Sequence, residues 1–463
     1  MIIGKKLEGF EYRMWKKVRT KLNQFTPAQI IVSFYFLAVS ISTILLSLPI
    51  AHRSYDDWTF LNAIFTAVSA VSVTGLTVVP TAETFSVPGY FILMFVLQFG
   101  GIGIMTLGTF IWMVIGKKIG LKERKLIMTD QNQSHLSGLV SLMKQILIII
   151  VFIEMGGAII LGTYFLKYFP TWQEAYLQGL FASVSATTNA GFDITGESLI
   201  PFAGDYFVQF INILLLTLGA IGFPVLIEVK NFLFTKSATR YQFSLYTKLT
   251  TVTFFSLTAL GTIAILLLEF DGFSRGKQWH ESFFYAFFQS VTTRNGGLAT
   301  IDVSEFSVPT LLVLSALMFI GASPSSVGGG IRTTTFALNL LFMFHFARGK
   351  KTIKLFRREI HEEDIIKSLV VSMMAILLCF IAVILLSITE PFSLMSIIFE
   401  VSSAFGTTGL SMGITPELSS LGKIVIIALM FIGRVGILSF LFLMGTRGKE
   451  VNYHYPKERV IIG

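Results

Sequence analysis

The sequence predicts an all-α integral membrane protein, in which eight transmembrane helices and four re-entrant pore helices form four tandem helix-pore-helix repeats around one pseudo-fourfold pore. Three observations support this fold class. The 463 residues are 53% hydrophobic and only 14% charged, a composition that soluble domains do not have. Apolar stretches recur at lengths that cross about 30 Å of hydrocarbon. The outward connections between these stretches repeat a short motif four times.

The apolar stretches set the order of the predicted transmembrane helices. Each is long enough for a helix to cross the membrane, and charged residues are rare within them. They lie at 28–50, 90–115, 141–167, 206–229, 244–268, 309–343, 366–388 and 421–445.

Basic residues fall mainly on one side of these segments. Seven Lys and Arg residues precede the first segment, and most of the 36 in the chain lie in the tails and connections on that same side. The positive-inside bias places this side and both termini in the cytoplasm. The sidedness accounts for the net charge of +9 and argues against nucleic-acid binding. Since the arm is too long for a signal peptide, we expect the first helix to be uncleaved.

Four outward connections share an apolar stretch that runs from a Phe to a Gly ten residues later and is followed by a large apolar residue. These stretches are 65–75, 181–191, 287–297 and 399–409. Ten residues cannot span a bilayer, so each is predicted to be a re-entrant pore helix followed by an irregular turn. Irregular backbone at membrane depth is tolerated only where it is buried in protein or lines a water-filled path. Four similar turns around one axis therefore predict a pore.

Glycine at the same place in four turns indicates a backbone with positive φ, because that conformation costs little only without a Cβ. Consecutive carbonyl oxygens can then point to one axis and replace the water around a cation, as in filters selective for potassium. Small residues also pack helices together, and a single glycine would favour that interpretation; four in register favour a filter. The predicted filter, with potassium as the bound ion, is Val73, Thr74 and Gly75; Asn189, Ala190 and Gly191; Asn295, Gly296 and Gly297; and Thr407, Thr408 and Gly409.

A second glycine recurs 24 to 28 residues after each filter glycine, at Gly100, Gly219, Gly321 and Gly433. In the third repeat this glycine opens the run GASPSSVGGGIRTTT at 321–335, which interrupts an apolar span. Glycine and proline break the helical hydrogen-bond ladder, so a polar loop at membrane depth is predicted below the filter. A phosphate-binding loop is excluded because the spacing G-x-x-x-x-G-K-[ST] is absent. The predicted gate consists of Gly321, Ser323, Pro324, Gly328, Gly329, Gly330 and Arg332, together with Arg434.

Charges within the spans are functional candidates, because burying them in a membrane is costly. Arg434 is interpreted either as an electrostatic barrier on the pathway or as a paired structural group. Arg294, three residues before Gly297, is expected to point away from the axis, toward Glu400 or an outer-loop acid. Glu154 is either a proton or cation site or a polar group in a helix contact.

The chain shows no constellation of nucleophile, base and orienting group, and its six histidines have no metal-ligand spacing. An enzyme is therefore not predicted, and no cofactor is expected. The lone Cys379 excludes a disulfide framework and is interpreted as a small apolar residue. A coupled secondary transporter of another small cation or solute is the alternative function. Such folds usually carry inverted repeats, whereas the repeats here are parallel.

These residues and motifs resemble the membrane subunit of the Trk/Ktr/HKT superfamily of potassium transporters, and most of all a bacterial Ktr-type subunit. The resemblance covers about 28–463 and rests on the fourfold filter, the 321–335 run and the run FIGRVG at 431–436. It implies potassium uptake, with the filter role carried by Gly75, Gly191, Gly297 and Gly409. Glycine in all four turns matches the potassium-selecting members, whereas Ser in the first turn is associated with sodium conduction. The resemblance also identifies 321–335 as an intramembrane gating loop and implies that Arg434 faces the pathway.

The resemblance further implies a homodimer in a bacterial plasma membrane, with the carboxyl-terminal end VIIG buried at the dimer interface. It implies sodium stimulation and control by a cytosolic ring of nucleotide-binding subunits. No G-x-G-x-x-G occurs here, so nucleotide would have to act through another polypeptide. The charged inner connection 348–367 is either a solvated face near anionic lipid or a docking site for that ring. The predicted domains are an arm, 1–27; repeat 1, 28–116; a loop and repeat 2, 117–232; a loop and repeat 3, 233–346; a loop and repeat 4, 347–446; and a tail, 447–463.

Overall fold

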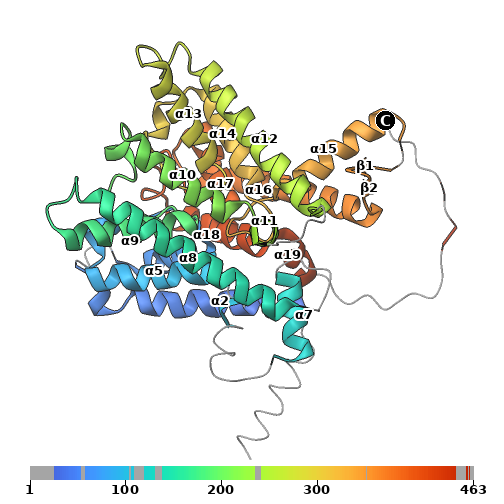
Figure 1. Cartoon of the computed structure of the whole chain (residues 1–463), viewed down its shortest axis with the longest axis horizontal. Coiled ribbons are helices and arrows are strands. Elements are labelled where there is room, and N and C mark those ends of the chain that lie inside the picture. The colour runs from blue at the N-terminus through green and yellow to red at the C-terminus, as the bar shows by residue number, and fades with distance from the viewer. Residues whose placement is uncertain are drawn as a thin grey trace, which may run out of the picture.

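The computed structural model describes residues 26–53, 58–103, 106–108, 119–130, 138–234, 241–350, 352–444, 455–456 and 458. Helices form most of this part of the chain (Figure 1). The basic residues of the amino-terminal arm and the final VIIG lie outside the described residues, so the predictions about them stay predictions.

The order of first helix, pore helix and second helix occurs four times. The first helices are α2 (Pro27–Leu46), α8 (Leu139–Phe165), α12 (Leu245–Leu268) and α16 (Glu362–Thr389). The pore helices are α3 (Phe60–Ser72), α9 (Trp172–Thr187), α13 (Trp279–Thr292) and α17 (Leu394–Gly406). The second helices are α5 (Val87–Gly101), α10 (Tyr206–Ala220), α14 (Val308–Ile320) and α18 (Ser420–Val435), and the last three continue in α11 (Phe223–Phe234), α15 (Thr333–Ala347) and α19 (Ile437–Met444).

Shorter elements connect these helices. They are η1 (Pro49–Ala51), α4 (Thr81–Thr84), α7 (Leu121–Asp130), η2 (Ile200–Phe202), η3 (Val303–Glu305), and the strands β1 (Lys354–Leu355) and β2 (Arg358–Glu359). Hydroxyl and carboxylate side chains begin many of the helices. Thr59, Thr171 and Ser393 accept backbone N–H groups at the starts of α3, α9 and α17. Such caps satisfy donors that would otherwise be unpaired in an apolar setting.

The four repeats close into a ring. The second helix of each repeat contacts the pore helix of the next repeat, since α5 packs on α9, α10 on α13, α14 on α17 and α18 on α3. The last of these contacts joins the fourth repeat to the first. This closure places the four pore helices around one axis and confirms the predicted all-α fold.

The first helices are the longest apolar elements. Within the described residues, α2, α8, α12 and α16 are each long and apolar enough to cross a membrane alone. Their outer faces expose large apolar side chains, among them Phe152, Leu267 and Ile388. Such faces suit contact with lipid.

The second helices differ from the prediction, because breaks occur in the second and fourth repeats as well as in the third. The segments 206–229 and 421–445 were expected to be unbroken, but α10 and α11 meet at an angle of 105° and α18 ends at Val435, directly before Gly436. Gly222 and Gly436 have φ of 104° and 89°, so the helix cannot continue through them. In the third repeat, α15 begins at Thr333, so the irregular loop is shorter than the predicted 321–335.

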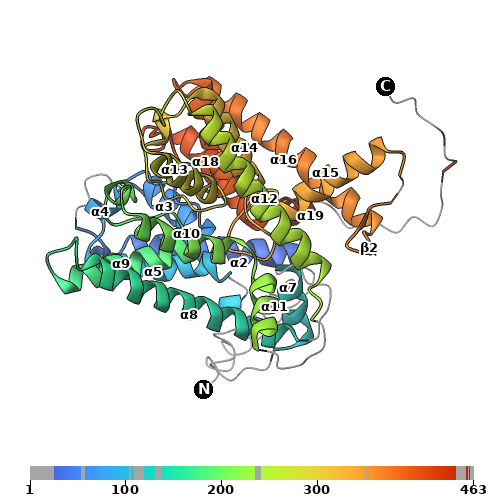
Figure 2. The same cartoon turned by 45° about the horizontal axis from the view of Figure 1, so that its top comes forward.

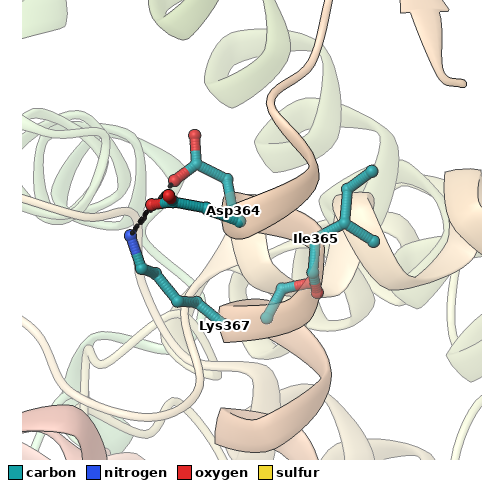
Figure 3. A network of polar contacts seen from close by, with 5 residues as sticks. Asp364, Ile365 and Lys367 are labelled. Atoms are coloured by element: carbon teal, nitrogen blue, oxygen red, sulfur yellow. Dashed lines mark hydrogen bonds and ion pairs between the residues drawn. The ribbon is translucent and has the colours of Figure 1, made fainter. Parts of the chain in front are cut away.

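The charged inner connection forms a small hairpin between α15 and α16. Strands β1 and β2 pair antiparallel, and the two residues between them, Phe356 and Arg357, have positive φ, as a tight hairpin turn requires. Figures 1 and 2 show α15 and this hairpin projecting from one end of the helical body, away from α9. At the start of α16, Lys367 lies 3.4 Å from Glu363 and 3.9 Å from Asp364 (Figure 3). These pairs are exposed and contribute little to stability.

Candidate ion pathway

The four predicted filter turns share one backbone conformation. In each turn, φ is positive at the filter glycine and again two residues earlier. The earlier residues are Val73 (57°), Asn189 (52°), Asn295 (76°) and Thr407 (51°), and the glycines are Gly75 (93°), Gly191 (69°), Gly297 (68°) and Gly409 (95°). The residue between each pair does not have positive φ. Four sequences that differ in their side chains therefore adopt the same alternation of backbone handedness.

This conformation is costly for two of the four earlier residues. Val73 and Thr407 are β-branched, and such residues rarely adopt positive φ. Backbone strain of this kind costs on the order of 1–3 kcal/mol per residue and clusters at functional sites. Backbone hydrogen bonds help to hold the strained turns, since Thr74 N–H donates to the Ser69 carbonyl at 2.8 Å and Thr408 N–H to the Ser403 carbonyl at 2.8 Å. The strain indicates that the position of the turn backbone takes precedence over the local conformational preference of these two residues.

The four glycines meet around the axis. A Cβ added to Gly191 would lie 2.9 Å from the Cα of Gly297, and one added to Gly297 would lie 2.5 Å from the Thr408 carbonyl oxygen. A Cβ on Gly75 would lie 2.5 Å from the Ala190 carbonyl oxygen, and one on Gly409 would clash with the backbone of Thr74. Each glycine thus abuts the backbone of a neighbouring turn, and no larger residue fits in this structure.

Hydroxyl groups on the pore helices brace each turn from behind. Ser69 and Ser403 accept the N–H groups of Gly75 (3.1 Å) and Gly409 (3.0 Å). In the second and third turns, Ser185 and Thr292 instead donate to the carbonyls of Phe192 (2.5 Å) and Leu298 (2.6 Å). These four residues were not among the site residues predicted from the sequence. A hydroxyl residue five or six positions before every filter glycine was the available signal.

The second recurring glycine has a packing role in three repeats. Gly100, Gly219 and Gly433 lie against the carbonyls of Val71, Thr187 and Phe405, each of which stands four residues before a filter glycine. A Cβ would clash with each carbonyl. In the third repeat, Gly321 instead lies against Gly329 of its own loop. Small residues therefore let three second helices approach the pore turns, whereas the third makes room for the loop.

The predicted gate loop links α14 to α15 and is bonded to the second repeat. Ser323 N–H donates to the Ala220 carbonyl at 3.1 Å, and Phe223 N–H donates to the Ser325 carbonyl at 2.8 Å. The Tyr246 hydroxyl donates to the Pro324 carbonyl. The loop thus lies across the break between α10 and α11.

The two arginines of the predicted gate have different partners. Arg332 folds back so that its Nη1 donates to the carbonyl of Gly328, and to that of Ser323 at 3.4 Å. Arg434, on α18, donates from Nη2 to the carbonyl of Gly100 in the first repeat. The Arg434 side chain is buried, and its Nε and Nη1 have no hydrogen-bond partner within the described part of the chain. This charge is only partly satisfied.

Within the described part of the chain, Arg294 bonds to backbone carbonyls rather than to the acid expected from the sequence. Its fully buried guanidinium donates from Nη2 to the Leu317 carbonyl at 2.9 Å and from Nη1 to the Gly321 carbonyl at 3.5 Å. It therefore caps the carboxyl-terminal end of α14, where unpaired carbonyls attract a cation. Glu400 instead accepts the hydroxyls of Thr415 and of Ser411, the latter at 2.8 Å, and so ties α17 to the segment after Gly409.

Glu154 lies in a helix contact. Its carboxylate oxygens accept the side-chain amide of Gln98 on α5 at 2.8 and 3.0 Å, and its backbone carbonyl accepts the Ser183 hydroxyl on α9. Within the described residues there is no cluster of three or more His, Cys, Asp and Glu residues that could hold a metal ion.

Carboxylates join the outer ends of the first and second helices in three repeats. Asp205 accepts from Tyr164 and Tyr168, Glu269 from Ser307 and Thr310, and Glu390 from Ser419. Burial raises the pKa of Glu269, but the hydrogen bonds from Thr310, Ser307 and Phe273 outweigh it, and the pKa lies below the ordinary 4.5. The ionised form is therefore stabilised by folding.

Similar proteins show the family and the fold to which this chain belongs. A sequence model of the TrkH family, described as a cation transport protein, matches residues 2–447. The Ktr system potassium uptake protein D of Bacillus subtilis is 66% identical to this chain, over 96% of this chain and 98% of that protein. The potassium/sodium uptake protein NtpJ of Enterococcus hirae is 35% identical, over 97% and 99%. The crystal structure of the potassium transporter TrkH from Vibrio parahaemolyticus superposes with a TM-score of 0.72 at 20% identity, covering 91% of this chain and 86% of that chain, and shares the fold.

Proposed function

Since this chain belongs to the TrkH family of cation transport proteins, we propose that it takes up potassium across the plasma membrane of a bacterium. Potassium uptake is named for relatives that match nearly the whole chain at 66% and 38% identity. The parallel order of the repeats favours this function over the alternative of a secondary transporter coupled to another solute.

The shared backbone of the four filter turns is the observation that carries the proposal. Potassium loses its water and is coordinated by carbonyl oxygens of Val73, Thr74 and Gly75 and of the corresponding residues in the other three turns. Positive φ at two residues in each turn supports this assignment, because it gives four different sequences one geometry. The strain at Val73 and Thr407 supports it as well, because strain of that kind persists where function requires it.

The loop below the filter is the proposed gate. Residues Gly321, Ser323, Pro324, Gly328, Gly329, Gly330 and Arg332 close the inner path, and the incompletely paired Arg434 adds an electrostatic barrier to cations. Inward flux is driven by the membrane potential, which supplies about 2.3 kcal/mol per charge per 100 mV. Both termini are placed in the cytoplasm by the distribution of Lys and Arg.

Regulation and assembly complete the proposal. The protein acts as a homodimer, is stimulated by sodium and is controlled by a cytosolic ring of nucleotide-binding subunits. The exposed hairpin of β1 and β2 beside the charged start of α16 offers a docking surface on the cytoplasmic side. Lack of a G-x-G-x-x-G motif in the chain is in keeping with a separate nucleotide-binding polypeptide.

Potassium uptake into cells that lack potassium transporters tests the function. The chain is expressed with and without a candidate ring subunit, sodium is varied, and the wild type is compared with Gly297→Ser. We expect the wild type to restore growth at low potassium. We expect Gly297→Ser to abolish uptake or admit sodium, because its Cβ would approach the Thr408 carbonyl to 2.5 Å. A wild type that moves no potassium even with the partner would refute the substrate assignment.

A further inference from the structure

The predicted gate loop packs directly against two side chains of the filter. A Cβ added to Gly328 would lie 2.7 Å from Nδ2 of Asn295, in the third turn. A Cβ added to Gly329 would lie 2.6 Å from Oγ1 and 2.7 Å from Cγ2 of Thr407, in the fourth turn. The two glycines thus leave no room for a methyl group, and the tip of the loop packs directly against these two turns.

Asn295 connects the same two turns to each other. Its fully buried side-chain amide donates to the Thr407 carbonyl at 2.9 Å, to Thr407 Oγ1 at 2.7 Å and to the Gly406 carbonyl at 2.5 Å. The turn that receives these bonds is strained, because Thr407 is β-branched and has positive φ. Val73, at the equivalent position of the first turn, has no polar side chain to form such a link.

The loop itself is fastened on its other side. Val327 N–H donates to the Gly219 carbonyl at 3.3 Å, in the second repeat, and Arg332 holds the carbonyl of Gly328. The loop therefore spans from α10 to the third and fourth filter turns. A displacement large enough to clear the path would remove Gly328 from Asn295 and Gly329 from Thr407.

We propose that the loop is a structural part of the filter, and that Asn295 is the positioning residue through which the loop sets the preference for potassium over sodium. Contact with Gly328 holds the Asn295 amide on the Thr407 carbonyl, and contact with Gly329 holds the strained Thr407. When the loop moves, the fourth turn relaxes, its carbonyls leave the potassium geometry and the ion preference falls. This inference rests on the proposed function and adds that gate and filter change together.

Ion binding by the purified full chain tests the inference without relying on transport. A bound ion stabilises the folded state by mass action, so the concentrations of potassium and of sodium that give half of the maximal thermal stabilisation report the ion preference. In Gly329→Ala, the added methyl displaces the loop from Thr407, and we expect the preference for potassium over sodium to fall about tenfold. Gly156→Ala makes the same chemical change on α8, where nothing lies within 4 Å, and should keep the wild-type preference.

Two further variants separate a lost contact from general damage. Asn295→Leu keeps the side-chain size but removes the donors, so the preference should fall as in Gly329→Ala although the loop is unchanged. Adding Thr407→Ala to Gly329→Ala removes both atoms that the methyl meets, so the preference should return part of the way to the wild type. If Gly329→Ala does not fold, Asn295→Leu decides.

The outcomes distinguish the inference from the proposed function. A wild-type preference in both Gly329→Ala and Asn295→Leu would overturn the inference and leave potassium uptake standing. A double variant no closer to the wild type than Gly329→Ala would also count against the inference, because the methyl would then act elsewhere, such as on the Gly433 carbonyl 3.0 Å away. A wild type that neither ion stabilises would overturn both proposals.

Discussion

The level of the filter and the level just below it follow different rules. At the filter, four turns with different sequences have positive φ at the same two positions. Below it, the second helices of the second and fourth repeats break at Gly222 and Gly436, whereas the third carries a loop from Gly321 to Arg332. The fourfold repeat is therefore kept in the backbone of the predicted filter turns, and it is lost in the second helices, where only the third repeat carries the long loop.

The two buried arginines, Arg294 and Arg434, differ in how fully their guanidinium groups are hydrogen-bonded. Arg294 belongs to a filter turn, yet its guanidinium caps the end of α14 and so serves the scaffold. Arg434 lies at the lower level and makes one hydrogen bond to the first repeat, while two of its nitrogens stay unpaired among the described residues. Substitutions at these two positions should therefore have different effects, in flux for Arg434 and in stability for Arg294.

Arg434→Ala should give the larger effect. Removing a cation beside the path lowers the barrier to potassium, and a barrier about 1.4 kcal/mol lower would raise the uptake rate about tenfold. Initial uptake of potassium at equal membrane expression measures the change. Arg275→Ala, on an exposed outer segment, is the control for lost positive charge and should have no effect. Unchanged kinetics in Arg434→Ala would show that this arginine is a structural group and that the lower level has no electrostatic barrier.

The sequence predicted the symmetrical level better than the asymmetrical one. The spacing from Phe65 to Gly75 and its three counterparts located the turns, because a repeated pattern survives changes of side chain. Positive φ at Val73 and Thr407 was beyond prediction, since local preference opposes it and only the closed ring of turns enforces it. The run of Pro324 and three glycines announced the loop in the third repeat.

Other features depended on contacts that are distant in sequence. The single glycines Gly222 and Gly436 look like ordinary helix-packing residues, so the breaks they cause were missed. Arg294 bonds to a carbonyl at the end of α14 and not to the acid that charge alone suggested. Backbone carbonyls at helix ends cannot be recognised from a pattern of side chains. The contact of Gly328 with Asn295 likewise appears only when the loop in the second helix of the third repeat packs against the filter turn of the same repeat.

Arg294→Met should lower stability rather than change flux directly. The substitution leaves the carbonyls of Leu317 and Gly321 without their donor in a buried site, at a cost of about 1–3 kcal/mol. Thermal unfolding of the purified protein measures the loss. Arg294→Lys keeps the charge but not the two-armed donor, and should be intermediate. Equal stability of Arg294→Met and the wild type would mean that the α14 end is satisfied by other groups.

The smallest effect is expected at the outer ends of the repeats, where the question is whether the same helix-to-helix contact occurs in all four repeats. Carboxylates join first and second helices in the second, third and fourth repeats, whereas in the first repeat His52 bonds to the Leu46 carbonyl. Because folding lowers the pKa of Glu269, its ionised form contributes stability above the unfolded pKa, and that contribution is lost as the pH falls through the folded pKa.

Glu269→Gln should therefore unfold at a lower temperature than the wild type at pH 7, by an amount that reflects about 1 kcal/mol, the net contribution of a typical hydrogen bond. The difference should shrink as the pH falls from 7 through the folded-state pKa of Glu269, which lies below the ordinary 4.5, because the protonated wild-type carboxyl resembles the amide. Unfolding temperatures of both proteins across that range measure it. A difference in unfolding temperature that persists in acid would mean that the shape of the Glu269 side chain, not its charge, joins α12 to α14. The outer ends would then be held by packing, as the predicted filter turns are.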